Sequence, residues 1–273
     1  MRLIFTSLFA LLAVVALQLS ARAEIVLTTS TYTQNFDSLG TTSTTSAFSG
    51  TTISQIPKLT DWDGARVGGS GTSANLIADN GAGNSGGLYS YGAAGGADRA
   101  LGALASGTNI MGFGFQLRNN TGAAITSIDI AFTQENWRSS TSNQNTIVAG
   151  WSLTSAAVTS SSYLTAASTE FSTVAALNLV GPAPVTTNGA LDGNLASNQV
   201  SRSASITGLS LAQGESIFFR WTDANDVGND AGLAIDNFTL TAFSSSAVPE
   251  PATLSLLGVA IGLGAVARFR RKS

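Results

Sequence analysis

Oxygen-bearing side chains are concentrated in one short stretch of the sequence. DANDVGND begins at Asp223 and also holds Asn225, Asp226 and Asp230. Ca²⁺ is bound by roughly six to eight oxygens from carboxylates, amides and carbonyls, so the stretch is a candidate calcium loop. It is not an EF-hand, because Val227 occupies the fifth loop position and no Glu occupies the twelfth. The alternatives are a calcium-binding loop and a polar turn between two strands.

A second acidic candidate is Asp236, in the run GLAIDNFTLTAF. In a regular strand it would share the core side with Phe238 and Leu240, and a buried carboxylate is costly unless it is paired, hydrogen-bonded or metal-bound. Asp37 is the candidate partner, as in jelly-roll modules where an early and a late Asp often meet near a structural ion. Alternatively, Asp236 accepts hydrogen bonds from loop amides, or a bulge turns it outward. We expect a structural role.

Nucleophilic catalysis of the usual kinds is excluded by composition. The chain contains no His and no Cys, which removes Ser-His-Asp and Cys-His catalysis and His-ligated zinc. Glycoside hydrolysis would need two carboxylates roughly 5–10 Å apart. The sequence marks no such pair, because Glu135, Glu170 and Glu215 are scattered. We therefore expect a non-enzymatic protein, with a carboxylate-based hydrolase as the weakest alternative.

Tryptophan offers a different chemistry, because exposed aromatic rings stack on the apolar faces of sugars. Trp62 and Trp137 lie near polar turn sequences, DWDG and ENWR, and are the candidate sugar contacts. Trp151 and Trp221 lie in apolar alternating runs and are expected in the core. For Trp62 and Trp137 as well, ordinary packing is the competing interpretation.

The elements that must position these residues are strands. Short alternating runs, separated by clusters of Gly, Ser, Asn and Asp, are typical of an all-β fold. The clearest runs are residues 24–29, 109–118, 125–134, 146–154, 200–206, 216–223 and 232–243. We expect a jelly-roll-like antiparallel β-sandwich over residues 24–243. The alternative, a β-helix, would need a fixed repeat, which the sequence does not show.

Two connections can also be predicted. The sequence NNTG at 119–122 lies between two strong runs and predicts a hairpin turn. The Gly-rich stretch 68–87 predicts a loop or very short strands. Residues 244–247, SSSA, predict a linker.

The N-terminal segment predicts a secretory signal peptide over residues 1–23. Arg2 is followed by a nearly uninterrupted apolar run, and Ala21 and Ala23 fit the small-x-small cleavage rule. Cleavage would start the mature chain at Glu24, whereas without cleavage the same segment would be a membrane anchor.

Charge argues against nucleic acid as a partner. Charged residues make up 11% of the chain and the formal net charge is −3. Six of the basic residues fall in the two end segments, which leaves the body more acidic than the whole. Since no basic patch is present to neutralise phosphates, we expect no nucleic-acid binding.

Several blocks of the body, in order, carry a family resemblance. They are QNFDSL at 34–39, ALGAL at 100–104, LRNNTG at 117–122, ITSI at 125–128, QENWR at 134–138, GALDG at 189–193, ITGL at 206–209, RWTDAND at 220–226 and GLAIDNF at 232–238. Together they resemble a secreted bacterial β-sandwich domain that also occurs attached to extracellular nucleases. The resemblance implies a jelly-roll-like module of unknown ligand. It does not imply nuclease activity, because the catalytic domain is absent.

The C-terminal segment combines a short motif, an apolar run and a basic cluster. Val248 precedes the motif residues Pro249, Glu250 and Pro251, and residues 252–267 carry no charge. As a helix this run would be roughly 24 Å long, slightly less than a bilayer core. We therefore expect a transmembrane helix at about 252–268.

The basic cluster predicts the orientation of that helix. Arg268, Arg270, Arg271 and Lys272 would stay on the cytoplasmic side and stop transfer, so that the body faces out. A plain single-span anchor would have the same pattern of residues.

Residues 248–273 resemble the PEP-CTERM sorting signal of Gram-negative bacteria, a tail also labelled an ice-binding protein C-terminal domain. The resemblance implies that Pro249, Glu250 and Pro251 are recognised by an exosortase. It further implies that the protein travels to the cell surface or an exopolysaccharide matrix. The leading hypothesis is thus a non-enzymatic surface or matrix protein, and the alternative is a carbohydrate-binding module for extracellular polysaccharide.

Overall fold

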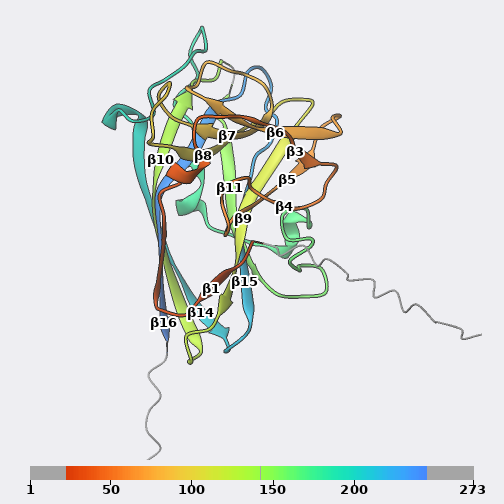
Figure 1. Ribbon diagram of the computed structural model, residues 1–273, viewed down its shortest axis with the longest axis vertical. Helices are drawn as coiled ribbons and strands as arrows, with labels where there is room; N and C mark the ends of the chain where they lie inside the picture. The colour runs from red at the N-terminus through yellow and green to blue at the C-terminus, as the bar shows by residue number, and fades with distance from the viewer. Residues whose placement is uncertain (1–22, 142, 245–273) are drawn as a thin grey trace, which may run out of the picture.

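The computed structural model describes residues 23–141 and 143–244, which form two packed β-sheets (Figure 1). The predicted all-β sandwich is confirmed. The expected signal helix up to Arg22 and the sorting tail from Val248, with its transmembrane helix at about 252–268, lie outside the described residues. Within the described ranges, no helix has the length and apolar character needed to cross a membrane.

Sheet 1 has eight strands. Six follow one another in the order β12 (Ser172–Thr173), β11 (Thr146–Leu153), β15 (Ser216–Thr222), β9 (Ile110–Asn119), β5 (Asp63–Gly68) and β4 (Ser54–Gln55). Two more strands pair with members of this path, β1 (Ile25–Leu27) with β9 and β13 (Leu179–Val180) with β11. The β1–β9 pair is parallel, so the sheet is mixed rather than purely antiparallel.

Sheet 2 also has eight strands. Seven run in the order β14 (Gln199–Leu211), β10 (Ile125–Arg138), β16 (Gly232–Ser244), β8 (Ala100–Leu104), β7 (Gly87–Tyr91), β6 (Ser73–Asp79) and β3 (Thr44–Ser49). The eighth, β2 (Thr31–Gln34), pairs with β16, and β6 runs parallel to β7. Short 3-10 helices lie in the connections: η1 (Asp37–Leu39), η2 (Ser168–Glu170), η3 (Ala175–Leu177) and η4 (Ala196–Asn198).

The main core lies between the sheets and follows from the alternation of the strands. Each of the three longest apolar runs turns every second side chain inward. The buried sets are Met111, Phe113, Phe115 and Leu117 of β9, Ile128, Ile130 and Phe132 of β10, and Ile217, Phe219 and Trp221 of β15. Burial of one such side chain stabilises the fold by about 1.5–3 kcal/mol. These inward faces were all predictable, whereas Trp151 is only half-buried and packs against the rim of the core.

The predicted hairpin at 119–122 is wrong. β9 belongs to sheet 1 and β10 to sheet 2, so the segment between them crosses from one sheet to the other. The buried Asn119 holds the crossing in place, because its Nδ2 donates to the carbonyl oxygens of Ala123 and Leu211, both at 2.8 Å. In return, its Oδ1 accepts from the backbone N–H of Thr121 at 3.0 Å.

The Gly-rich stretch 68–87 contains more structure than expected. β6 has seven residues and pairs with β3 on one side and with β7 on the other. Its Ala74 and Leu76 are buried in the main core, which stabilises a strand that its Gly and Ser neighbours obscure in the sequence.

Sheet 1 carries a second layer on its outer side. Residues 154–171 cover β15, so this strand is buried on both faces. The ring of Phe218 packs against that of Tyr163, with 5.1 Å between their centroids. The Arg220 guanidinium donates to the carbonyl oxygens of Tyr163 at 3.0 Å and Ala166 at 2.7 Å, and it lies 3.6 Å from the ring centroid of Phe171.

Candidate functional site

The acidic stretch at 223–230 is a hydrogen-bonded loop between β15 and β16. Asn145, which lies just before β11, donates through Nδ2 to Asp226 Oδ2 at 2.6 Å and to Asp230 Oδ1 at 2.9 Å. Its own Oδ1 accepts from the backbone N–H of Ala231 at 2.7 Å. Asp223 Oδ1 accepts from the backbone N–H of Ala224 at 2.8 Å. One amide thus ties two carboxylates of the loop together.

Burial shifts the proton equilibria of this loop. Loss of solvent raises the pKa of Asp223 well above its ordinary value. The same cause raises the pKa of Asp230 to about 6. Asp223 Oδ2 and Asp230 Oδ2 have no hydrogen-bond partner among the described residues. These two side chains therefore favour their protonated forms more than exposed carboxyls do.

Asp236 does not point toward the main core as regular alternation predicts. Asp236 pairs with Thr133 while Thr239 pairs with Ala131, so β16 has one extra residue at this point. Asn237 has a φ of 50°, in the left-handed region that such a bulge uses. The bulge turns Asp236 to the outer side of sheet 2, and covering loops keep it 3% exposed.

The predicted partnership of Asp37 with Asp236 stays a prediction, and no hydrogen bond joins the two side chains among the described contacts. Burial is the main cause that raises the pKa of Asp236 to about 6, and the charges of Asp98 and Asp37 add to it. Asp236 Oδ2 accepts from Asn237 Nδ2 at 2.7 Å, and Oδ1 has no hydrogen-bond partner in the described ranges. Asp37 accepts through Oδ1 from the backbone N–H of Arg99 at 3.1 Å.

Several oxygens of the predicted calcium site take part in hydrogen bonds within the protein. In the part of the chain that the structure describes, no group of three or more acidic side chains is placed to hold a metal ion. Asn225 is exposed, while Asp226 and Asp230 already share the amide of Asn145. Calcium binding through Asp37, Asp223, Asn225, Asp226, Asp230 and Asp236 stays a prediction, and the hydrogen bonds favour the alternative of a polar turn.

Trp62 lies at the centre of the main core, so the expectation of an exposed sugar contact is wrong for this residue. It is 0% exposed. Its ring contacts Phe115 and Trp221, with centroid distances of 4.8 and 5.9 Å. Its Nε1 donates to Tyr32 Oη at 3.1 Å. The polar neighbours Asp61 and Asp63 gave a misleading signal, because Asp63 is itself buried and accepts from Tyr163 Oη at 3.2 Å.

Trp137 is also buried, at 1% exposure, and cannot present a free ring face. It stacks on Tyr91, which stacks on Tyr89, at centroid distances of 5.8 and 4.5 Å. A Cβ on Gly193 would lie only 2.4 Å from the indole, which shows how closely the loop backbone covers it. The structure thus contradicts the predicted sugar contact at both tryptophans.

The glutamates occupy separate parts of the fold. Glu135, on β10, accepts from Trp137 Nε1 at 2.9 Å and from Gln199 Nε2 at 3.1 Å. Burial raises the pKa of Glu135 to about 7. Glu170 lies in η2 and Glu215 in the turn between β14 and β15, both exposed.

Sequence reasoning missed a cleft on the surface of the sandwich. It has a volume of about 660 Å³ and lies between the β14–β15 turn and the first residues of the 154–171 segment. Its lining includes Gln116, Leu153, Ser210, Glu215 and Ser216. These positions come from three separate regions of the sequence and share no motif, so no sequence signal could have assembled them.

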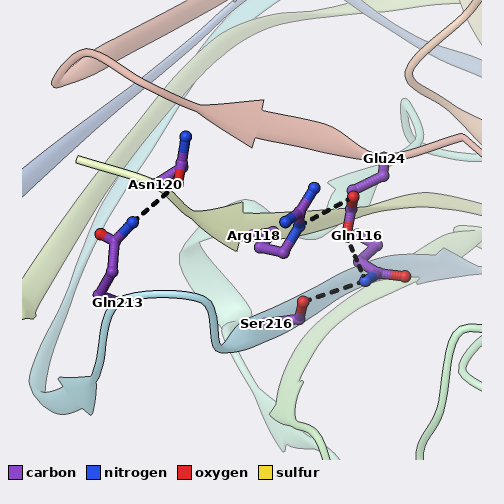
Figure 2. A network of polar contacts seen from close by, with 6 residues as sticks. All are labelled: Glu24, Gln116, Arg118, Asn120, Gln213 and Ser216. Carbon is purple, nitrogen blue, oxygen red and sulfur yellow. Dashed lines mark hydrogen bonds and ion pairs between the residues drawn. The ribbon is translucent and has the colours of Figure 1, made fainter. Parts of the chain in front are cut away.

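A polar network fixes one side of the cleft (Figure 2). Gln116 Nε2 donates to Glu24 Oε1 at 2.7 Å and to Ser216 Oγ at 3.0 Å. Arg118 Nε forms an ion pair with Glu24 Oε2 at 3.0 Å. β9, β15 and the start of the described chain are thereby joined.

Comparison with known proteins gives a family match at one end only. A search of curated protein sequences finds no match. Among solved structures, the K3 adhesin domain of Lys-gingipain from Porphyromonas gingivalis has a TM-score of 0.29 and 13% identity, over 66% of this chain and 91% of that one. The module TmCBM61 in complex with β-1,4-galactotriose has a TM-score of 0.27 and 9% identity, over 54% and 72%.

The enzymatically active domain of bacteriophage CBA120 tailspike protein 4 has a TM-score of 0.29 and 11% identity, over 54% of this chain. This chain spans only 16% of the tailspike chain. Scores this low carry no argument about ligand or activity.

The family match agrees with the C-terminal pattern of motif, apolar run and basic cluster. Residues 247–272 match the model of the PEP-CTERM protein-sorting motif, which indicates export and processing by an exosortase. The chain therefore carries a PEP-CTERM sorting tail directly behind its β-sandwich.

Proposed function

We propose that this chain is a non-enzymatic protein of the cell surface or exopolysaccharide matrix, delivered by its C-terminal tail. The observation that carries the proposal is the position of the sorting motif. β16 ends at Ser244 and the motif begins at residue 247. Processing near Pro249–Glu250–Pro251 would therefore release or transfer the whole β-sandwich and little else.

The body is suited to an extracellular structural role. Its cohesion comes from extensive aromatic packing rather than from disulfides, since the chain has no cysteine. The carboxylates whose pKa is raised by burial accept hydrogen bonds from amide and indole donors, as Asp230 does from Asn145 and Glu135 from Trp137. This arrangement supports structural rather than catalytic roles for these acids.

The proposal is tested by following the full chain in cell fractions. We expect wild-type protein to reach the surface or the medium in a shortened form. Glu250→Ala should leave full-length protein in the inner membrane, because the central residue of the motif is lost. Glu170→Ala, which removes an exposed glutamate of the body, is the matched control and should behave as wild type. Normal maturation of the Glu250→Ala variant would refute the processing claim.

Binding of polysaccharide is a second candidate function, but not through tryptophan. Trp62 and Trp137 are buried, so an aromatic platform built from them is ruled out. The observation that favours binding is the polar cleft beside Gln116 and Glu215.

A further inference from the structure

We propose that the cleft between the β14–β15 turn and the 154–171 segment binds a neutral, hydroxyl-rich polysaccharide. This deepens the proposed surface role by naming a ligand class for the body. The volume of about 660 Å³ falls within the range of small-ligand sites, roughly 300–1,000 Å³. A cleft of this size can hold a short stretch of a sugar chain whose ends extend into solvent.

The side-chain amide of Gln116, a lining residue of the cleft, is held in a fixed orientation. A carboxylate only accepts hydrogen bonds, so the Gln116 atom that faces Glu24 must be its nitrogen. That nitrogen also donates to Ser216 Oγ, and the Gln116 side-chain oxygen is directed away from both contacts (Figure 2). The amide cannot rotate without losing the bond to the Glu24 carboxylate. A sugar hydroxyl would therefore meet an oriented carbonyl oxygen, at a low entropic cost of binding.

The rim of the cleft is held in place as well. Gln213, in the β14–β15 turn, donates through Nε2 to Asn120 Oδ1 at 2.7 Å, and its Oε1 accepts from the backbone N–H of Gly122 at 2.8 Å. Glu215 Oε2 accepts from the backbone N–H of Ala212 at 2.8 Å, within the same turn. The turn is thus attached to the crossing between the two sheets.

The charge of the lining selects against acidic ligands. Of the described residues that line the cleft, Glu215 is the one with a charge, and the remaining polar members are Gln116 and Ser or Thr residues. An anionic chain would meet a carboxylate and no cation. Hydroxyl, amide and carboxylate groups instead match the donors and acceptors of a neutral sugar.

One apolar residue of the lining is exposed. Leu153, at the end of β11, is 39% exposed. The C–H face of a sugar ring can cover such a side chain while its hydroxyls reach the polar lining.

Strand β14 offers a matched pair of variants. Ser210 and Ser203 are both exposed residues of β14, but Ser210 lines the cleft and Ser203 lies on the open outer face of sheet 2. Tyr suits a strand at either position. Ser210→Tyr would fill the cleft, whereas Ser203→Tyr would add an aromatic ring elsewhere.

The test is affinity gel electrophoresis of the purified full chain in mild detergent. Gels contain dextran, galactomannan or, as the anionic comparison, alginate. We expect retardation by at least one neutral polymer and none by alginate. Ser210→Tyr should weaken the affinity for the retarding polymer about tenfold or more, while Ser203→Tyr should leave this affinity unchanged. Melting temperatures of both variants show whether the fold is intact.

Glu215→Gln checks the assignment to a neutral ligand, because it removes the charge and keeps an oxygen for the N–H of Ala212. We expect less than about a threefold change in affinity. The inference is overturned by absent retardation in both neutral polymers, by retardation in alginate, or by Ser210→Tyr binding as wild type. Because the protein is purified, none of these outcomes depends on sorting. Failure of the sorting proposal would be seen instead in the cell-fractionation experiment.

Discussion

The outer faces of the two sheets differ in what covers them. On sheet 1, residues 154–171 pack over β15, and Phe218 lies beneath them with 1% of its surface exposed. On sheet 2, the part of the outer face around Asp236 and Trp137 is covered. Elsewhere on it, neighbouring strands place short, mostly polar side chains side by side in the open. Two such rows are Thr33, Thr239, Ala131 and Ser203, and Thr31, Thr241, Asp129 and Ser205.

This contrast explains where a cleft can form. A flat face of short side chains gives only shallow depressions. The covered face has an edge, where the 154–171 segment begins, and the cleft lies at that edge. The double Phe at 218–219 is the sequence sign of a strand buried on both sides, whereas alternating Ser marks the open face.

The largest expected effect is a difference in the free energy of unfolding when Phe is replaced by Ala on each face. Phe218→Ala should lower the free energy of unfolding by about 3–5 kcal/mol, because it leaves a cavity under the covering segment. Phe243→Ala, on β16, removes a ring that is already 47% exposed, and should cost less than about 1 kcal/mol. Urea unfolding measures both, and equal costs would remove the distinction between the faces.

The next largest loss of stability is expected when Arg220 is replaced. Arg220→Met keeps much of the side-chain volume but leaves the carbonyl oxygens of Tyr163 and Ala166 without their donor. We expect a loss of about 2–3 kcal/mol and faster proteolysis within residues 154–171. The open face of sheet 2 should retain its wild-type cleavage pattern. Unchanged proteolysis of the covering segment would show that Arg220 does not hold it.

The pH dependence of stability sharpens the comparison at the covered part of sheet 2. Burial raises the pKa of Glu135 to about 7 and that of Asp236 to about 6. The unfolded chain releases these protons near pH ~4, so between about pH 4 and 7 the native state binds more protons. Stability should therefore fall as pH rises through this interval.

Thermal melts across that interval measure this effect. We expect a higher melting temperature at about pH 5 than at about pH 8, and a smaller difference in Glu135→Gln. A melting temperature that rises with pH over this range would contradict the claim that burial disfavours the charged forms of Glu135 and Asp236.

The smallest change in the free energy of unfolding is expected in the exposed polar rows of sheet 2. Thr239→Ala should change the free energy of unfolding by less than about 0.5 kcal/mol, because its side chain faces outward in the array. Urea unfolding with Phe218→Ala in parallel measures it. A loss above about 2 kcal/mol would mean that this face is packed against something.

Sequence alone was sufficient for the strands with strong alternation, since β9, β10 and β15 each carry a full apolar face. It could not assign those strands to sheets. NNTG at 119–122 is compatible with a hairpin and with a crossing, and the choice depends on distant contacts of Asn119 with Leu211.

The candidate site was harder to predict for a similar reason. One extra residue near Asn237 reversed the side on which Asp236 lies. Trp62 and Trp137 entered the interior because ring partners from other strands stack on them, although their polar neighbours resemble a surface turn. The cleft brings together residues 116, 153, 210 and 215, which no local pattern connects.

The most direct test of the central claim is mass spectrometry of the mature termini of surface-associated protein. Delivery by the sorting motif predicts a chain that begins at Glu24 and ends at or near Pro249, Glu250 and Pro251, with the basic cluster after Ala267 removed. The Glu250→Ala variant should instead retain Ser273. Surface-associated wild-type protein that still ends at Ser273 would contradict the account.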